Sequence, residues 1–205
     1  SSSVSSDLSS GVIDIYSNDG VSAGDGAFAA LKSDGSVVTW GASDYGGDSS
    51  SVSSDLSSDV IDIYSTNRAF AALKSDGSVV TWGVSDEGGD SSSVSSDLTS
   101  SVIDIYSANY AFAALKSDGS VVTWGASDWG GDSSSVSSDL SSGVIDIYSN
   151  GGSFAALKSD GSVVTWGDSA WGGGSSSVSS DLSSGVIDIC PNGLAFAALK
   201  SDGSV

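Results

Sequence analysis

Aspartate is the chemically capable residue that recurs most regularly in this sequence. One aspartate stands inside the apolar segment Val-Ile-Asp-Ile of each repeat, as Asp14, Asp62, Asp104, Asp146 and Asp188. Burying a carboxylate costs free energy unless it is paired or hydrogen-bonded. One interpretation is a structural link between strands, with backbone amides or the once-per-repeat lysines as partners: Lys32, Lys74, Lys116, Lys158 and Lys200. The other is a ring of carboxylates around a central channel that holds a cation.

A second group of acidic residues borders a glycine-rich turn. These residues are Asp44, Asp48, Asp86, Asp90, Asp128 and Asp132. Oxygen-rich loops bent by glycine suit Ca²⁺, which is the one cofactor that the sequence suggests. The order of ligands matches neither an EF-hand nor an RTX nonapeptide, and the fourth repeat has Ser169-Ala170-Trp171 at this place. Ordinary turn chemistry, with Asp capping and Gly at positive φ, is therefore the competing interpretation.

The composition excludes several classes of function. The 205 residues include no His and one Cys, so Ser-His-Asp and Cys-His catalysis, His-ligated zinc and an internal disulfide are ruled out. With 26 acidic and 6 basic residues, the net charge is −20, which repels polyanions. No apolar run is long enough to cross a bilayer. We expect no enzyme, no nucleic-acid partner and no membrane insertion.

Two short loops vary among otherwise nearly identical repeats. The residue before each Gly-Gly is Tyr45, Glu87, Trp129 or Trp171, and the loop before each repeated Phe contains Arg68, Tyr110, Gly152 or Leu194. Variation confined to two loops indicates an exposed edge open to recognition. Tyr45, Arg68, Tyr110, Trp129 and Trp171 are the candidates, and their aromatic rings would suit a glycan. Drift at unconstrained positions is the alternative.

The elements that must position these residues belong to an internal repeat. The string Phe-Ala-Ala-Leu-Lys-Ser-Asp-Gly-Ser-Val begins at Phe28 and recurs four times at a step of 42 residues. The repeats span residues 1–48, 49–90, 91–132, 133–174 and a shorter 175–205, and together form one array over 1–205. The first is longer because of a six-residue insertion between Asn18 and Gly26. One tryptophan per complete repeat is assigned a structural role: Trp40, Trp82, Trp124 and Trp166.

The sequence of each repeat predicts short strands joined by turns. In the first, β-branched and aromatic residues predict strands over 12–16, 27–32 and 36–40, the last two joined at Ser33-Asp34-Gly35. A fourth, weaker strand is predicted over 49–56, anchored by Val52 and Leu56. The strands are apolar on both faces, so neighbouring sheets must cover both. The prediction is an all-β propeller of about five blades, or part of a larger one. A linear β-solenoid and a stacked-hairpin filament are the alternatives.

The hairpin also resembles a known family. Val-Ile-Asp-Ile-Tyr-Ser, Phe-Ala-Ala-Leu-Lys-Ser-Asp-Gly-Ser-Val-Val-Thr-Trp-Gly and Ser-Asp-Trp-Gly-Gly-Asp are similar, in this order, to the RCC1-type repeat. The sequence resembles still more closely the tandem arrays of large bacterial surface or secreted proteins. The resemblance implies a β-propeller. The repeat is shorter than the family's, Phe replaces the usual His, and Gly-Gly-Asp replaces Gly-Gln-Leu-Gly.

Two further expectations concern the ends of the array. Residues 1–8 could add a strand to the sheet of 186–205 and close a five-bladed ring, or the array could be part of a longer one. Cys190 takes the place of the repeated Tyr. A buried lone thiol is expected there, and an intermolecular disulfide is the alternative.

These observations lead to a functional prediction. The chain is expected to be a non-enzymatic structural or adhesive module of a large extracellular bacterial protein, located outside the cell or on its surface. A lectin-like module that binds through the variable loops is one alternative. A subunit of a fibrous assembly, formed by self-association at strand edges, is another. The expected partners are a protein, a glycan or further copies of the chain.

Overall fold

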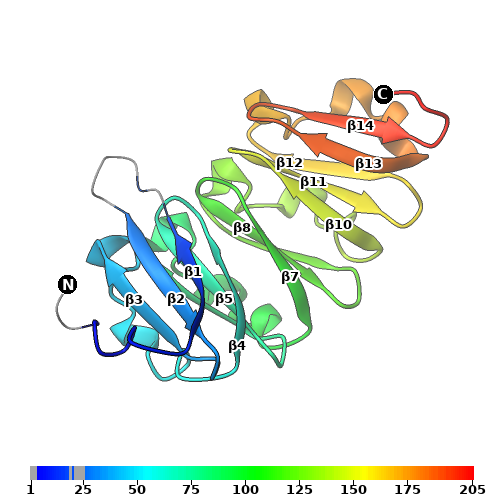
Figure 1. Ribbon diagram of the computed structural model, residues 1–205. Helices are drawn as coiled ribbons and strands as arrows, with labels where there is room; N and C mark the ends of the chain where they lie inside the picture. The colour runs from blue at the N-terminus through cyan, green and yellow to red at the C-terminus, as the bar shows by residue number, and fades with distance from the viewer. Residues whose placement is uncertain (1–3, 19, 21–25) are drawn as a thin grey trace. The chain divides into compact units, whose positions relative to one another are not determined.

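The computed structural model describes residues 4–18, 20 and 26–205, and the fold is all-β. Each repeat forms its own antiparallel sheet, in which consecutive strands pair in sequence order (Figure 1). The strands of the first two sheets are β1 (Val12–Ser17), β2 (Ala27–Lys32), β3 (Val37–Gly41), β4 (Val60–Ser65), β5 (Ala69–Lys74) and β6 (Val79–Gly83). Those of the next two are β7 (Val102–Ser107), β8 (Ala111–Lys116), β9 (Val121–Gly125), β10 (Val144–Ser149), β11 (Ser153–Lys158) and β12 (Val163–Gly167). The last sheet contains β13 (Val186–Pro191) and β14 (Phe196–Lys200).

The chain divides into two compact halves, Ser1–Val102 and Ile103–Val205. The three strands predicted over 12–16, 27–32 and 36–40 and the hairpin at Asp34-Gly35 are confirmed. The insertion in the first repeat lies mostly outside the described residues, as do residues 1–3. No helix among the described residues is long and apolar enough to span a membrane.

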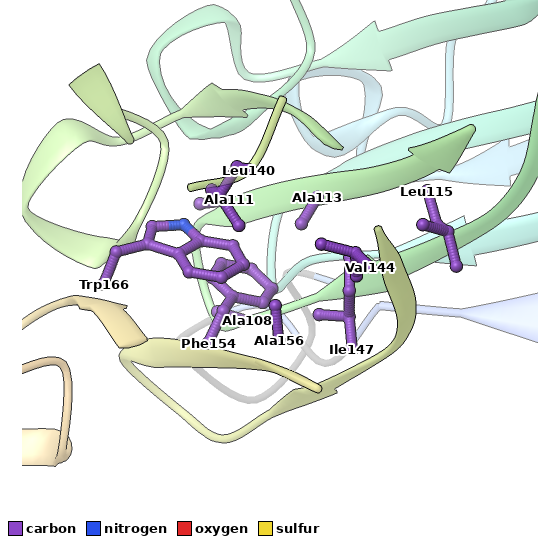
Figure 2. Packing of buried hydrophobic residues seen from close by; sticks show 10 residues of the cluster. All are labelled: Ala108, Ala111, Ala113, Leu115, Leu140, Val144, Ile147, Phe154, Ala156 and Trp166. Atoms are coloured by element: carbon purple, nitrogen blue, oxygen red, sulfur yellow. The ribbon is translucent and has the colours of Figure 1, made fainter. Parts of the chain in front are cut away.

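Within each half, successive sheets bury each other's faces, as the two-sided apolar pattern predicts. In the N-terminal half, Ala29 and Leu31 of β2 pack in one cluster with Phe70 and Ala72 of β5 and with Trp82. Figure 2 shows the corresponding cluster of the C-terminal half, where Ala113 and Leu115 meet Phe154, Ala156 and Trp166. Phe70 and Phe154 are fully buried, whereas Phe28 of the first sheet is 39% exposed. Each of these two fully buried phenylalanines therefore lies where a preceding sheet packs against it.

A β-bulge near the start of the first strand of a sheet changes the predicted alternation of residues between its two faces. The pairing of β4 with β5 shifts between Val60 and Asp62, and the same shift occurs in β1, β10 and β13. The extra residue places Val60 and Ile63, three positions apart, in the core, while Ile61 is 56% exposed. Strict alternation would place Asp62 on the same face as Val60, whereas the bulge turns it to the other face. An isoleucine is exposed at this position in each sheet: Ile13, Ile61, Ile103, Ile145 and Ile187.

The serine-rich segments do not form the predicted fourth strand. They contain 3-10 turns instead: Ser50–Val52, Ser92–Leu98, Ser134–Val136, Ser176–Val178 and Asp181–Ser183. Ser53 and Ser57 donate side-chain hydrogen bonds to the carbonyls of Ser50 and Ser54, at 3.0 and 2.7 Å, which favours a turn over a strand. Val52 and Leu56 still act as apolar anchors, because both lie in the core cluster of their half.

The described part of the first serine-rich segment likewise forms turns. Residues 4–8 are in turn conformation, and the Leu8 amide donates to the Val4 carbonyl at 3.1 Å. A strand over 1–8, which the predicted closure of the ring requires, is therefore not formed by the described residues 4–8.

Cys190 is exposed, so the prediction of a buried thiol is wrong. It lies in β13 at the position that Tyr16 and Tyr106 occupy in other sheets, where the tyrosine contacts the following sheet. None of the described residues packs a further sheet over β13 and β14, so the thiol faces solvent.

Candidate functional site

Two clusters of variable loop residues form the candidate site, one in each half. Each cluster includes residues of two short 3-10 turns, and each turn follows the third strand of a sheet: Ser43–Tyr45, Ser85–Glu87, Ser127–Trp129 and Ser169–Trp171. The glycine after the turn adopts positive φ, as at Gly46 (102°) and Gly130 (97°), and its amide bonds back to the first serine of the turn. This geometry holds the residue before Gly-Gly beside the loop between the first two strands.

In the N-terminal half, Arg68 is held between an aromatic ring and a carboxylate. Its guanidinium carbon lies 5.1 Å from the centre of the Tyr45 ring, and Nη1 lies 2.9 Å from Glu87 Oε1. The cation–π contact and the ion pair both favour the charged guanidinium. We refer to Tyr45, Arg68 and Glu87 as the Arg68 cluster.

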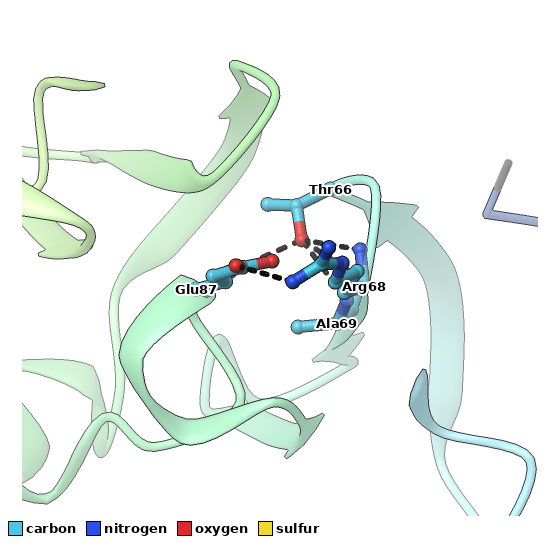
Figure 3. A network of polar contacts seen from close by, with 4 residues as sticks. All are labelled: Thr66, Arg68, Ala69 and Glu87. Carbon is cyan, nitrogen blue, oxygen red and sulfur yellow. Dashed lines mark hydrogen bonds and ion pairs between the residues drawn. The ribbon is translucent and has the colours of Figure 1, made fainter. Parts of the chain in front are cut away.

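A threonine fixes the loop that carries Arg68. Thr66 Oγ1 accepts the Ala69 amide at 3.0 Å and donates to the Glu87 carbonyl at 3.1 Å (Figure 3). It also accepts the Arg68 amide at 3.3 Å, so one hydroxyl joins the loop to the neighbouring turn. Asn18 and Asn150 perform the same function with amide groups, donating to the carbonyls of Tyr45 and Trp171.

In the C-terminal half the variable residues form an aromatic cluster of Tyr110, Trp129 and Trp171. The rings of Tyr110 and Trp129 meet edge to face at 4.8 Å, and those of Trp129 and Trp171 lie 5.7 Å apart at 51°. Trp171 also lies over Gly151 and Gly152, where a Cβ atom would come within 2.5 and 2.8 Å of its ring. All three aromatic side chains are half-buried.

The variable residue of a loop therefore contacts the variable residue of the turn beside it. Arg68 pairs with Glu87, whereas in the fourth repeat Gly152 leaves space for Trp171. Sequence reasoning identified the variable residues but not these pairings, because residues 19 or 42 positions apart had no visible relation. Each cluster presents a partly covered surface rather than a freely exposed loop. Leu194, the loop residue of the last repeat, is 60% exposed.

The repeated aspartates join neighbouring sheets, as the structural interpretation proposed, but through a partner that the sequence analysis missed. Asp62 Oδ1 accepts the Ile63 amide at 2.8 Å and the hydroxyl of Tyr16, from the preceding repeat, at 2.8 Å. Tyr106 and Tyr148 donate in the same way to Asp146 and Asp188, at 2.8 and 3.1 Å. The signal was available, because Tyr16, Tyr64, Tyr106 and Tyr148 recur two residues after the aspartate.

The tyrosines show the electrostatic consequence of this link. Burial, the neighbouring Asp146 carboxylate and the hydrogen bond to Asp188 together raise the pKa of Tyr148 to about 12. Burial and the bonded aspartate likewise raise the pKa of Tyr16 and of Tyr106. The phenols therefore keep their protons and act as donors at all physiological pH values.

One version of the structural interpretation paired the lysines with these aspartates, but three of the lysines bond to backbone carbonyls instead. Lys74, Lys158 and Lys200 donate to the backbone carbonyls of Asp55, Asp139 and Asp181, at 3.0, 2.7 and 2.9 Å. Their ammonium groups thus attach the serine-rich turn to the end of the central strand.

The aspartates that border the glycine-rich turn have backbone partners. Oδ1 of Asp48, Asp90 and Asp132 accepts the amide two residues later, at 2.9, 2.8 and 2.8 Å, in Asx turns. These bonds lower the pKa of the three carboxyl groups. Asp44, Asp86 and Asp128 lie in the first turn of their 3-10 helices. Among the described residues, no three His, Cys, Asp or Glu side chains are grouped as a metal site.

The once-per-repeat tryptophans belong to the scaffold. Trp82 and Trp166 are nearly fully buried, and each stacks on the phenylalanine of its own sheet at 5.3 Å. Their Nε1 atoms donate to the carbonyls of Gly46 and Gly130, at 3.0 and 3.1 Å. Each tryptophan thus joins its sheet to the glycine-rich turn of the preceding repeat.

Known proteins support this architecture. The family described as "Regulator of chromosome condensation (RCC1) repeat" matches residues 19–46. Residues 19–46 are therefore similar to an RCC1-type repeat. None of the curated proteins matches the sequence. The particular similarity to bacterial arrays stays a prediction.

Solved structures show the same RCC1-like fold at low sequence identity. Yeast RCC1 (Prp20) bound to Kap60 is 18% identical, with a TM-score of 0.51 over 76% of this chain and 43% of that one. A second structure, of Prp20p from Saccharomyces cerevisiae, is described with its binding to Gsp1p and histones. It is 19% identical, with a TM-score of 0.50 over 84% of this chain and 48% of that one. The ectodomain of the Physcomitrella patens receptor kinase CR4 is 15% identical, with a TM-score of 0.51 over 92% of this chain and 51% of that one. The chain thus spans about half the length of these proteins.

Proposed function

We propose that the chain is a non-enzymatic structural and adhesive module of a large extracellular bacterial protein, and that it binds partners through the variable clusters. The observation that carries the proposal is that the repeated and the variable side chains have different roles. The positions that repeat unchanged are used in sheet-to-sheet contacts, such as Tyr16 with Asp62 and Trp166 with Gly130. The positions that vary are gathered in the Arg68 cluster and the aromatic cluster.

The comparisons support a binding role in a general way. Prp20 is a protein of this fold with protein partners, and the CR4 domain is an ectodomain. We propose that the sheets of this chain are the blades of a propeller, either a closed ring of five or part of a larger one. A protein partner fits the Arg68 cluster, where the side chains of a charge pair, 25% and 19% exposed, lie beside a partly buried aromatic ring.

A glycan is the second candidate, favoured by the aromatic cluster. Tyr110, Trp129 and Trp171 offer adjacent ring surfaces, and a sugar ring with its apolar face can stack on such a surface. The net charge of −20 favours neutral or basic ligands over anionic ones. Self-association into fibres is the third candidate and would show as mass that rises with concentration in light scattering.

The test is a binding screen against defined glycans and defined extracellular matrix proteins. The wild type is compared with the triple variant Tyr110→Ser/Trp129→Ser/Trp171→Ser and with Glu87→Ala. The control is Ile145→Ser, at a residue that is 57% exposed and outside both clusters. We expect a ligand retained by the wild type and the control but lost from one cluster variant. Equal retention by all four proteins would refute the proposed site.

A further inference from the structure

Asn109 carries a side-chain amide with unused hydrogen-bonding capacity beside the aromatic cluster. The residue is half-buried and directly precedes Tyr110 in the loop between β7 and β8. Its backbone amide donates to the Gly151 carbonyl at 3.0 Å, which fixes it against the corresponding loop of the next repeat. Its side chain forms no hydrogen bond with any described residue. One acceptor and two donor positions are therefore available to a ligand.

The amide of Asn109 lies next to the ring of Trp171. A Cβ atom added to Gly151 would come within 2.5 Å of Trp171 Cζ3 and within 3.1 Å of Asn109 Nδ2. Both groups therefore border the same small region over the Gly151 backbone, which the glycine leaves clear of a side chain. An aromatic ring and a polar amide lie side by side there.

The backbone of Trp171 is held in place by its neighbours. Its carbonyl accepts hydrogen bonds from Asn150 Nδ2 and from Ser153 Oγ, both at 2.7 Å. No described residue accepts a hydrogen bond from the indole N–H of Trp171 or of Trp129. The rings are therefore preorganised, which lowers the entropic cost of binding a ligand, and their N–H groups remain available as donors.

We propose that the aromatic cluster and Asn109 together bind an uncharged sugar that carries two adjacent hydroxyl groups. Asn109 Oδ1 accepts a hydrogen bond from one hydroxyl and Nδ2 donates to the other, while the apolar face of the sugar packs against the aromatic rings. These residues contribute no charge, and the net charge of −20 disfavours anionic sugars. This inference rests on the proposed glycan binding and adds the residue that selects the ligand.

The second repeat supplies a matched control residue. Asn67 occupies the equivalent loop position and directly precedes Arg68. It is half-buried, as Asn109 is, and its side chain likewise forms no hydrogen bond with the described part of the chain. The substitutions Asn109→Leu and Asn67→Leu therefore remove the same amide group at equivalent positions, one beside the aromatic cluster and one beside the Arg68 cluster.

The test is calorimetric titration of the whole chain with three neutral probes: cellohexaose, maltohexaose and mannohexaose. We expect saturable binding of at least one probe, weakened about tenfold by Asn109→Leu and unchanged by Asn67→Leu. In the ¹⁵N-labelled wild type, the side-chain amide signals of Asn109 should shift with the same probe. Without ligand, the indole signals of Trp129 and Trp171 should keep their wild-type positions in Asn109→Leu. If leucine disturbs these signals, Asn109→Ala should weaken binding to the same extent.

The outcomes separate this inference from the proposed function. Suppose that Trp171→Ser abolishes the binding of a probe, while the Asn109 variants bind it as tightly as the wild type does. The role of Asn109 would then be overturned, and glycan binding at the aromatic cluster would stand. Tighter binding of trigalacturonic acid than of every neutral probe would overturn the selection of an uncharged sugar. No saturable binding of any probe up to about 10 mM would overturn both this inference and the glycan candidate, but not protein binding at the Arg68 cluster.

Discussion

The tyrosine–aspartate pair is the smallest unit of contact between repeats. Tyr16, Tyr106 and Tyr148 donate their hydroxyls to an aspartate of the next sheet. That aspartate also accepts the amide of the residue that follows it, as Asp146 accepts the Ile147 amide. Both donors bond to the same carboxylate oxygen, Oδ1 of Asp146. The sequence predicted a bonded aspartate at this position, because burial demands one, but it did not identify the hydroxyl donor.

Alkaline pH should weaken this contact. The folded state binds the Tyr148 proton more tightly than the unfolded chain does, since the pKa rises from 10.0 to about 12 on folding. The stabilisation is therefore complete below pH 10 and is lost as the pH rises towards 12. Urea unfolding from pH 8 to 12 should show the free energy of unfolding falling over this window. The free energy of unfolding of the Tyr148→Phe variant should fall less steeply with pH. Identical slopes for the variant and the wild type would contradict the assignment.

The scaffold tryptophans should be much less tolerant of substitution than their counterpart in the first sheet. Trp166→Phe removes a donor from a buried carbonyl and leaves a cavity, so it should lower the free energy of unfolding by about 2–4 kcal/mol. Trp40 is only half-buried, and Trp40→Phe should cost less than about 1 kcal/mol. Equal losses in chemical denaturation would show that the two indoles have the same environment.

Among the elements, the hairpin was predictable and the serine-rich turn was not. Asp34-Gly35 between two apolar segments is a strong local signal for a hairpin. The segment around Val52 and Leu56 has apolar residues four positions apart, which fit a turn, but it was predicted as a strand to complete a four-stranded blade. The serine hydroxyls that bond to backbone carbonyls decide between the two conformations, and composition alone does not show these bonds.

The hairpin glycines provide a matched pair of substitutions. Gly161 and Gly203 both have positive φ, at 78° and 85°. A Cβ on Gly161 would lie 2.7 Å from the Gly185 amide nitrogen, whereas one on Gly203 would meet nothing within 4 Å. Gly203→Ala should cost about 1 kcal/mol from backbone strain alone. Gly161→Ala should cost at least about 1 kcal/mol more. Equal denaturation midpoints would mean that the two turns are packed alike.

At the scale of the whole molecule, the repeat determined most of what could be predicted. The 42-residue period, the two apolar faces of each strand and the hairpin together indicated sheets that cover one another, and the structure has them. The contacts between variable residues could not be predicted, since they depend on which loops meet. Whether the array closes into a ring could not be predicted either, because the period of the repeat does not determine closure.

The net charge of −20 gives a prediction for the molecule as a whole. Screening the repulsion among carboxylates should stabilise the fold, so the unfolding temperature should rise as NaCl increases from 10 mM to about 0.3 M. Because the turn aspartates are engaged in Asx turns, CaCl₂ at matched ionic strength should give a similar rise. A much larger rise with CaCl₂, reversed by EDTA, would demonstrate a specific calcium site.

The central claim is that the repeated residues build the scaffold while the variable residues bind. The most direct measurement is an NMR titration of the ¹⁵N-labelled chain with a ligand from the binding screen, following the indole N–H signals of the tryptophans. For a ligand of the aromatic cluster, we predict that the signals of Trp129 and Trp171 shift progressively while those of Trp82 and Trp166 stay in place. Shifts of Trp82 and Trp166 with Trp129 and Trp171 unmoved would contradict the claim.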